Sequence, residues 1–429
     1  LEVDWGGDGV FSGASESLYM CGMNISRGRR AMLQRTGQGF ETIETGKAVF
    51  TLWNDDGRYD GWNSSSPLYP NVTYGKDCRL RVRDAVTGDI AYVFTGLISD
   101  IVPTSYGERA QVNIHVEDGW VFLRNNTASV SMAESVSPDQ AIGLVLDDVG
   151  WPERWGRSLD TGSADVIRYF WADGNMLVSS ECEEIANSFF GYFYIDAEGR
   201  TRYKDRLTVS SSVADFDEAF ISKDIHNPQP WVNQRSVMRI KTHPYDSTGT
   251  ALLYEYFGSD PMSIPASTSL APIFAAYTFN GNNVPALSIV TPVAGTDFTM
   301  NTAADGSGTD RTSSCTVTVT NLGSSAKIEI TNNSAGVVYV TMLRLRGVAI
   351  YERSVQDVTY PTDPSTVTQP KLFLIDSKWQ QNVNQAADFC TVMGPFFAGL
   401  HPFPTIQVES NFGYQFGIDL FDIVTLTSE

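Results

Sequence analysis

Apolar and polar residues alternate in several short runs of this chain, which is the pattern of β-strands with one buried face. In residues 79–83 the three arginines fall on one face, and Leu80 and Val82 on the other. Residues 48–52 and 110–116 alternate in the same way, and Asn, Asp and Gly cluster where turns must follow. We therefore predict that the first 127 residues form an antiparallel barrel or a tightly curled sheet. Similar runs predict strands at 3–5, 18–25, 90–97, 192–195, 200–206, 231–243, 273–279, 286–291, 315–320, 326–332, 337–346, 404–410 and 421–427.

Helical periodicity interrupts these strands at three places. Each candidate helix has a capping residue before its apolar stripe and a glycine near its expected end. The first predicted helix begins at Ser137, with Pro138 in its first turn. The second begins at the Ser180–Glu183 capping box and is expected to end at Gly191, and the third begins at Asp376 and is expected to end at Gly394. The chain is thus predicted to be mainly β with minor α.

Four segments in the first hundred residues stand in a characteristic order and spacing. They are a turn at residues 54–59, a Pro-Leu-Tyr at 67–69, a Gly-to-Arg strand at 75–83 and a Phe-Thr-Gly at 94–96. This series resembles the N-terminal segment of tail hub and minor tail proteins of tailed bacteriophages. Residues 25–29 and 117–123 resemble further parts of that segment, and 192–206 and 422–424 resemble later parts of the family. The resemblance implies a structural protein rather than an enzyme.

The same resemblance implies a multidomain chain. It predicts two tail-tube-like antiparallel β-barrels, a small α+β domain and an inserted β-sandwich. The expected boundaries are 1–127 for the first barrel, 128–222 for the α+β domain, 223–254 with 347–429 for the second barrel with one helix, and 255–346 for the insertion.

Composition narrows the possible partners. The 429 residues carry a formal net charge of −20, so nonspecific binding to nucleic acid is not expected, because phosphate binding needs clustered Lys and Arg. If DNA passes this protein, the acidic surface would repel it. No apolar run approaches the length of a membrane span, and we expect no membrane association by the chain itself.

The residue types that carry chemistry do not form a recognisable constellation. The five cysteines are far apart, which favours free buried thiols over a zinc site or a disulfide framework, and the four histidines are dispersed. Residues 54–61 faintly resemble a calcium loop, but Arg58 occupies a ligand position and the bidentate Glu is absent. We find no motif of a hydrolase, nucleotide-binding protein or metalloprotease, although a glycosidase pair of carboxylates leaves no local signature. No catalytic residue, metal or cofactor is therefore predicted.

Two features are candidates for contacts with other molecules. Arg79, Arg81 and Arg83 form either a subunit contact or a solvated exterior balanced by Asp77 and Asp84. Aromatic residues cluster in the following loops, which is typical of subunit interfaces but also of glycan platforms. The resemblance favours an interface formed by Trp53, Tyr59, Trp62 and Tyr69.

The resemblance finally implies a function and its partners. The expected protein is a homotrimeric hub in the virion tail, assembled in the host bacterial cytoplasm. It would join a hexameric tail tube or distal tail protein to a threefold tip or fibre, with DNA or a tape-measure protein passing through its lumen. The alternative is a carbohydrate-binding or glycan-degrading tail-tip protein whose binding module is the insertion.

Overall fold

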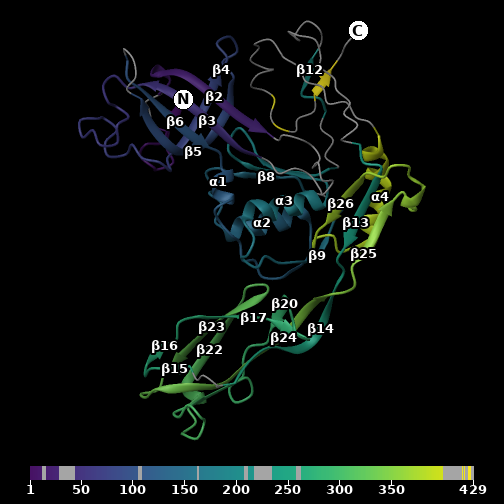
Figure 1. Ribbon diagram of the computed structural model, residues 1–429. Coiled ribbons are helices and arrows are strands. Elements are labelled where there is room, and N and C mark those ends of the chain that lie inside the picture. Colours follow the sequence, from purple (N-terminus) through teal and green to yellow (C-terminus); the bar gives the residue numbers. More distant parts are fainter. Residues whose placement is uncertain are drawn as a thin grey trace.

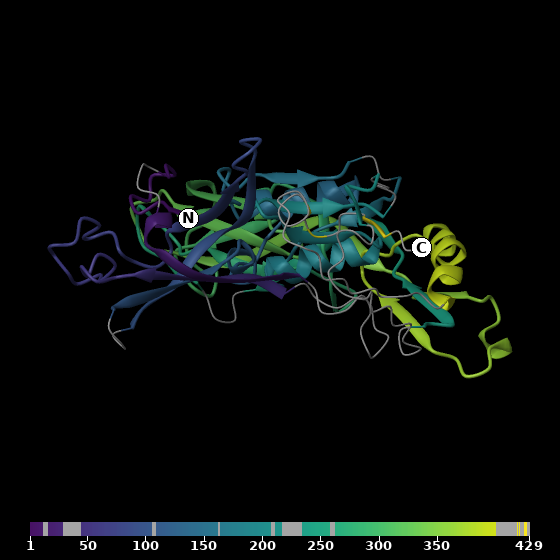
Figure 2. The ribbon, with the colours of Figure 1, turned by 90° about the horizontal axis from the view of Figure 1, so that it is seen from above.

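The computed structural model describes residues 1–11, 16–28, 44–104, 109–161, 164–206, 211–216, 234–257, 262–399, 418, 420 and 424–426. These residues are mainly β with minor α, as predicted, and they include four α-helices, of which the short helix at Trp120–Leu123 was not predicted. Figure 1 shows a sheet near the N-terminus, a central helical layer, a flank containing α4, and a β-rich arm below. Figure 2 shows the same arrangement from above. The strand predicted at 404–410 lies outside the described residues.

The first sheet has six strands in the order β1-β4-β5-β6-β3-β2, and every neighbouring pair is antiparallel. Its strands are β1 (Glu2–Val3), β2 (Met20–Gly28), β3 (Glu44–Trp53), β4 (Asp77–Arg83), β5 (Ile90–Thr104) and β6 (Gln111–Glu117), with a 3-10 turn at Glu16–Leu18. The predicted alternation holds in β6, where Val112, Ile114 and Val116 are buried. The pairings between described residues leave β1 and β2 as edges, so the sheet is open there and a closed barrel is not present in this part of the structure.

The central layer contains three helices and two small sheets. Its elements are α1 (Trp120–Leu123), β7 (Ala133–Val136), α2 (Pro138–Asp148), β8 (Arg157–Leu159), β9 (Ile167–Phe170), α3 (Val178–Ser188), β10 (Tyr192–Ile195) and β11 (Thr201–Lys204). Ser137 is the N-cap of α2 and forms a capping box with Gln140, and Pro138 stands at its first position, as predicted. The hairpin β10–β11 also forms where the sequence predicts it.

The prediction for α3 is wrong at both ends. This helix begins at Val178, two residues before Ser180, and ends before Gly191. The residue in the left-handed conformation at the end of this helix is Phe190, with φ of +59°, and not Gly191 as predicted. Gly191 is needed for a different reason, because a Cβ there would lie 2.7 Å from the Tyr203 ring.

A flank contains the third long helix. It comprises β13 (Val237–Thr242), β25 (Gln356–Tyr360), a 3-10 turn at Pro364–Thr366, β26 (Leu372–Asp376) and α4 (Val383–Ala398). The parallel pair β12 (Ala214–Phe216) and β27 (Val424–Leu426) forms a separate two-stranded sheet. β13 is the centre of a three-stranded sheet, antiparallel to β25 and parallel to β26. The described residues of the predicted second barrel thus form a small mixed sheet and not a closed barrel.

The prediction for the start and end of α4 is also wrong. Asp376 lies at the end of β26, opposite Lys241, because this segment pairs with β13. Asn382 caps the helix instead, with its side-chain oxygen accepting hydrogen bonds from two first-turn amides. Gly394 lies inside the helix, where a Cβ would be 2.4 Å from the Tyr360 ring, so its role is close packing rather than termination.

The arm is reached through two long antiparallel strands. They are β14 (Tyr245–Phe257) and β24 (Val338–Glu352), and they share a sheet with β15 (Ser263–Ile264), β20 (Ala286–Ile289) and β21 (Phe298–Asn301). A second sheet contains β16 (Thr268–Ser269), β17 (Ile273–Ala276), β22 (Cys315–Asn321) and β23 (Ser325–Asn332), with a 3-10 turn at Thr312–Ser314. A hairpin of β18 (Thr278–Phe279) and β19 (Asn282–Asn283) completes the arm. Ile328 and Ile330 of one sheet and Val340 and Leu343 of the other belong to one buried cluster, so the two sheets pack face to face.

The buried apolar residues that the structure describes form three clusters. One lies within residues 1–116 and one within 253–349, inside the first sheet and the arm respectively. The third runs from Trp120 to Phe397 and joins the central layer to the flank, with Phe170 and Trp379 rings 4.8 Å apart. The central layer and the flank therefore share one core. Their division into separate domains stays a prediction.

Candidate assembly surface

Arg79 and Arg81 project from one face of β4, as the alternation predicts, and both contact the same partner in their own chain. Glu2 on the edge strand β1 lies opposite Arg79 in the register and accepts hydrogen bonds from both arginines, with Arg79 Nε at 2.5 Å. Although partial burial opposes it, these two hydrogen bonds hold the pKa of Glu2 below its ordinary value. Arg83 differs, because its Nε donates to the carbonyl of Gly88 at 3.3 Å within its own hairpin.

Arg79 also lies beside a cleft between the first sheet and the central layer. The cleft has a volume of about 320 Å³, and Arg154 and Arg200 contribute to its lining. Each of the three arginines has an acidic partner: Glu2 for Arg79, Asp77 for Arg154 at 2.7 Å, and Asp196 for Arg200 at 2.8 Å. The three arginine charges of this cleft are therefore paired inside the chain.

Asp77 connects the first sheet to the central layer. Its carboxylate accepts hydrogen bonds from Arg154 Nε at 2.7 Å and from Trp155 Nε1 at 2.9 Å. Thr95 of the neighbouring strand donates to the carbonyl of Ala197 at 3.0 Å, across the same boundary. One of the two alternatives drawn from the sequence placed Asp77 in a solvated balance of charge with the arginines of β4, because nothing local indicates a partner almost eighty residues away.

The loop between β3 and β4 is built from consecutive turns. Backbone N–H groups of Gly57, Asp60, Asn63, Ser66 and Tyr69 each donate to the carbonyl three residues earlier, at 3.0–3.2 Å. Side chains reinforce these turns, because Asn54 Oδ1 accepts from the Tyr59 amide at 2.9 Å and Ser66 Oγ donates to the Arg58 carbonyl at 2.6 Å. A polar stretch that sequence analysis treated as a long loop is thus a defined element, seen as the indigo projection in Figure 2.

We call residues 54–76 the turn loop. A buried carboxylate accepts hydrogen bonds from residues at the base of this loop and beside it. Glu16 is fully buried and accepts hydrogen bonds from the Tyr59 hydroxyl, Trp5 Nε1 at 3.1 Å and Arg58 Nη2 at 3.5 Å. Burial, together with the hydrogen bond to Glu16, raises the pKa of the Tyr59 hydroxyl. Sequence analysis missed Glu16, because it lies in a Gly/Ser-rich segment without any periodic pattern.

The four aromatic residues of the predicted interface have different environments. Tyr59 is completely buried in its own core, so it has no surface to offer a second molecule. Trp53 is half-buried, with the Arg109 guanidinium 4.8 Å from its ring centroid. Trp62 and Tyr69 lie on the turn loop and are 78% and 48% exposed. These two residues, with Tyr74 at 80% exposed, give the loop an aromatic surface.

Metal-binding residue types, cysteines and helices also lie outside this surface. Among the described residues there is no cluster of three His, Cys, Asp or Glu side chains that could hold a metal ion. Four of the five cysteines are buried, as predicted, whereas Cys21 is exposed. No helix within the described ranges is both long and apolar enough to cross a membrane.

Comparison with known proteins gives partial structural likeness only. No family matches the chain, and no curated protein does. The solved structures with partial likeness include three tail proteins. The 43 kDa tail protein of prophage MuSo2 from Shewanella oneidensis is 13% identical with a TM-score of 0.35, and the tail protein from Neisseria meningitidis MC58 is 14% identical with a TM-score of 0.33. Each match covers 46% of this chain and 56% of that chain.

A third structure is prophage tail protein gp18 from Listeria monocytogenes EGD-e, which is 7% identical with a TM-score of 0.31. This match covers 52% of this chain and 56% of gp18. The chain thus spans little more than half the length of the three structures. At TM-scores below 0.5 these likenesses do not place the chain in a family.

Proposed function

We propose that this protein is a structural component of a bacteriophage tail and acts as its hub. In this role it joins the hexameric tail tube to a threefold tail tip and lines the channel through which DNA or the tape-measure protein passes. The proposal includes assembly as a homotrimer in the host cytoplasm, and a mechanical rather than catalytic action. Its basis is the ordered series of hub-like motifs between Asn54 and Gly96.

The observation that carries the proposal is the turn loop. A free surface loop of this length is usually irregular, whereas this one has a regular backbone bonding pattern and a buried carboxylate at its base. Such an element presents Trp62 and Tyr69 without further ordering, which reduces the entropic cost of association. Large aromatic residues on a rigid projection are typical of energetic hot spots in protein interfaces.

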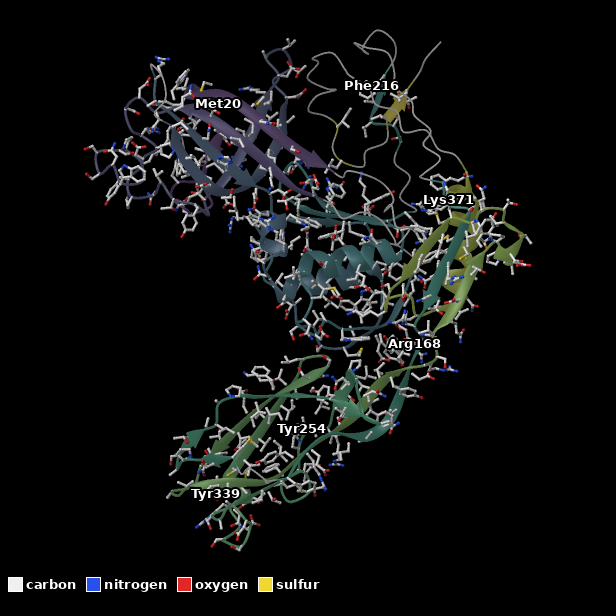
Figure 3. All side chains as sticks on the ribbon, in the orientation of Figure 1. Met20, Arg168, Phe216, Tyr254, Tyr339 and Lys371 are labelled. Carbon is white, nitrogen blue, oxygen red and sulfur yellow. The ribbon has the colours of Figure 1, made fainter. Side chains whose placement is uncertain are left out.

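A second feature suits the same role. β2 is a nine-residue edge strand, and no strand among the described residues pairs with its outer side. Exposed strand edges are sites at which another chain can add by backbone hydrogen bonding. Met20 marks this outer strand in Figure 3. The loop and the edge therefore offer two contacts from one domain, which is what a closed ring requires of each subunit.

The mass of the assembly tests the proposal. We expect light scattering at several concentrations to give about three times the 47.2 kDa of the chain, and electron microscopy to show rings. A double variant Trp62→Ser, Tyr69→Ser should shift this assembly to monomer while the circular dichroism spectrum stays unchanged. Phe274→Ser in the arm, which removes another exposed aromatic, is the matched control. A chain that stays monomeric both alone and with its tail-tube protein would overturn the proposal.

A further inference from the structure

A groove lies where the arm joins the rest of the chain. It is bounded by the β18–β19 hairpin and by the ends of β14 and β24 that face the central layer, and its volume is about 820 Å³. This is within the range of small-molecule sites in proteins. Arg168, labelled in Figure 3, donates a hydrogen bond to the Tyr245 carbonyl at 3.3 Å. This bond connects the first residue of β14 to the central layer.

Two aromatic rings form the apolar part of the groove. Phe279 and Tyr351 have ring centroids 6.1 Å apart and an interplanar angle of 34°. Tyr351 is 36% exposed, and no hydrogen bond of its hydroxyl occurs among the described residues. The groove therefore contains open aromatic surface with a polar group at its edge, which is the amphipathic character that Tyr brings to binding sites.

Three amide side chains surround these rings. Asn280, Asn282 and Asn283 line the groove, and all three are exposed. Within the described part of the chain, none of their amide groups bonds to another protein group. Asn280 and Gly281 have φ of +51° and +78°, the conformation of a tight two-residue hairpin turn, so the backbone that carries the amides is fixed.

We propose that this groove binds a neutral saccharide. A sugar ring has an apolar C–H face that covers an aromatic ring, and a rim of hydroxyl groups that both donate and accept hydrogen bonds. Carboxamides match this rim because each offers two donors and an acceptor. The charged groups of the groove already have partners, since Glu352 contacts His243 at 2.7 Å and Arg353 contacts Asp246 at 3.5 Å. A neutral ligand therefore fits better than a charged one.

The same lining argues for binding without cleavage. Glycoside hydrolysis ordinarily uses two carboxyl groups that flank the scissile bond. Glu352 is the sole carboxylate in the lining of this groove, and it is engaged by His243. This inference stands independently of the proposed hub function, because it concerns the arm and none of the turn loop.

The test is saturation-transfer NMR on the full chain with a panel of neutral saccharides: maltotriose, chitotriose, cellotriose, lactose and a mannose trisaccharide. We expect at least one of them to bind with Kd of about 1 mM or tighter. Tyr351→Ala and the double variant Asn282→Ala, Asn283→Ala should each weaken that binding by about tenfold or more. Phe274→Ala, which removes an aromatic residue that is 67% exposed elsewhere in the arm, should leave it unchanged.

Two results would overturn the inference. One is the absence of binding by every saccharide in the panel. The other is binding that persists at full strength in both groove variants, since the sugar would then occupy another surface. Thermal unfolding of each variant shows that the arm remains folded, and Tyr351→Phe retains the ring as a second, conservative variant.

Discussion

Removal of the Tyr59 hydroxyl is the sharpest available test of how the turn loop is held. In Tyr59→Phe the buried ring stays in place, and Glu16 loses one of its three donors. Hydrogen bonds to charged groups contribute about 1.5–3 kcal/mol to stability, and the remaining two donors still solvate the carboxylate. We therefore expect the free energy of local opening of the loop to fall by about 2 kcal/mol.

The assay is hydrogen exchange of the full chain, read by mass spectrometry on peptides that cover residues 54–69. A loss of about 2 kcal/mol corresponds to exchange about thirtyfold faster for the turn amides. Peptides from β22 and β23 in the arm should not change. Tyr69→Phe is the matched control, because Tyr69 lies in the same loop, is half exposed, and has no hydroxyl bond among the described residues.

The double variant decides whether the mechanism is right. Glu16→Ala should cost about 3–5 kcal/mol, because it leaves the Arg58 charge and two further donors without their acceptor. Adding Tyr59→Phe to it should then cost almost nothing, since the hydroxyl has no carboxylate left to bind. Equal protection in Tyr59→Phe and the unaltered protein, or strictly additive losses in the double variant, would refute the reasoning.

Three further predictions concern stability elsewhere. Burial raises the pKa of Asp118 to about 7, from 3.8 in the unfolded chain, so the folded state holds this proton more tightly. The contribution of Asp118 to stability therefore falls as pH rises from about 4 to about 7, by up to about 4 kcal/mol. Asp118→Asn should flatten that part of the pH profile of stability in urea unfolding, and an unchanged slope would contradict the prediction. Gly96→Ala should cost about 3 kcal/mol, because its Cβ would lie 2.2 Å from the carbonyl oxygen of Glu117, whereas Gly249→Ala, with open space around it, should cost far less in the same thermal unfolding experiment. Asn382→Ala should destabilise α4 by about 1 kcal/mol through loss of its N-cap, visible as faster exchange in the first turn of that helix; exchange equal to that of the unaltered chain would count against the cap.

Local patterns predicted much of the secondary structure because their causes are local. The alternation at 79–83 and 110–116 became β4 and β6, and Ser137 with Pro138 starts α2, since strand faces and helix caps depend on neighbours in sequence. The errors arose where a distant segment decided the outcome. Asp376 has the chemistry of a helix cap, but pairing with β13 draws it into a strand.

Glycines show the same limit. Gly191 and Gly394 were interpreted as helix terminators, which is the commonest role of a glycine after an apolar stripe. Both instead allow an aromatic ring to pack against the backbone, Tyr203 in one case and Tyr360 in the other. A sequence shows that a glycine is present but not which ring approaches it, because that contact forms only when separate elements meet.

The arginines of β4 illustrate what such distant contacts mean for assembly. Alternation places Arg79 and Arg81 on one face, but Glu2 binds both, and this pairing has no signature because the partners are almost eighty residues apart. A second subunit that used these arginines would have to displace Glu2, and the gain of a new ion pair would be offset by the loss of the old one. Trp62 and Tyr69 face no such competition, because their exposed rings lose only water on association. The free energy of association between subunits at this domain should therefore come mainly from the exposed aromatic residues of the turn loop. The arginines should instead contribute to the folding stability of the single subunit.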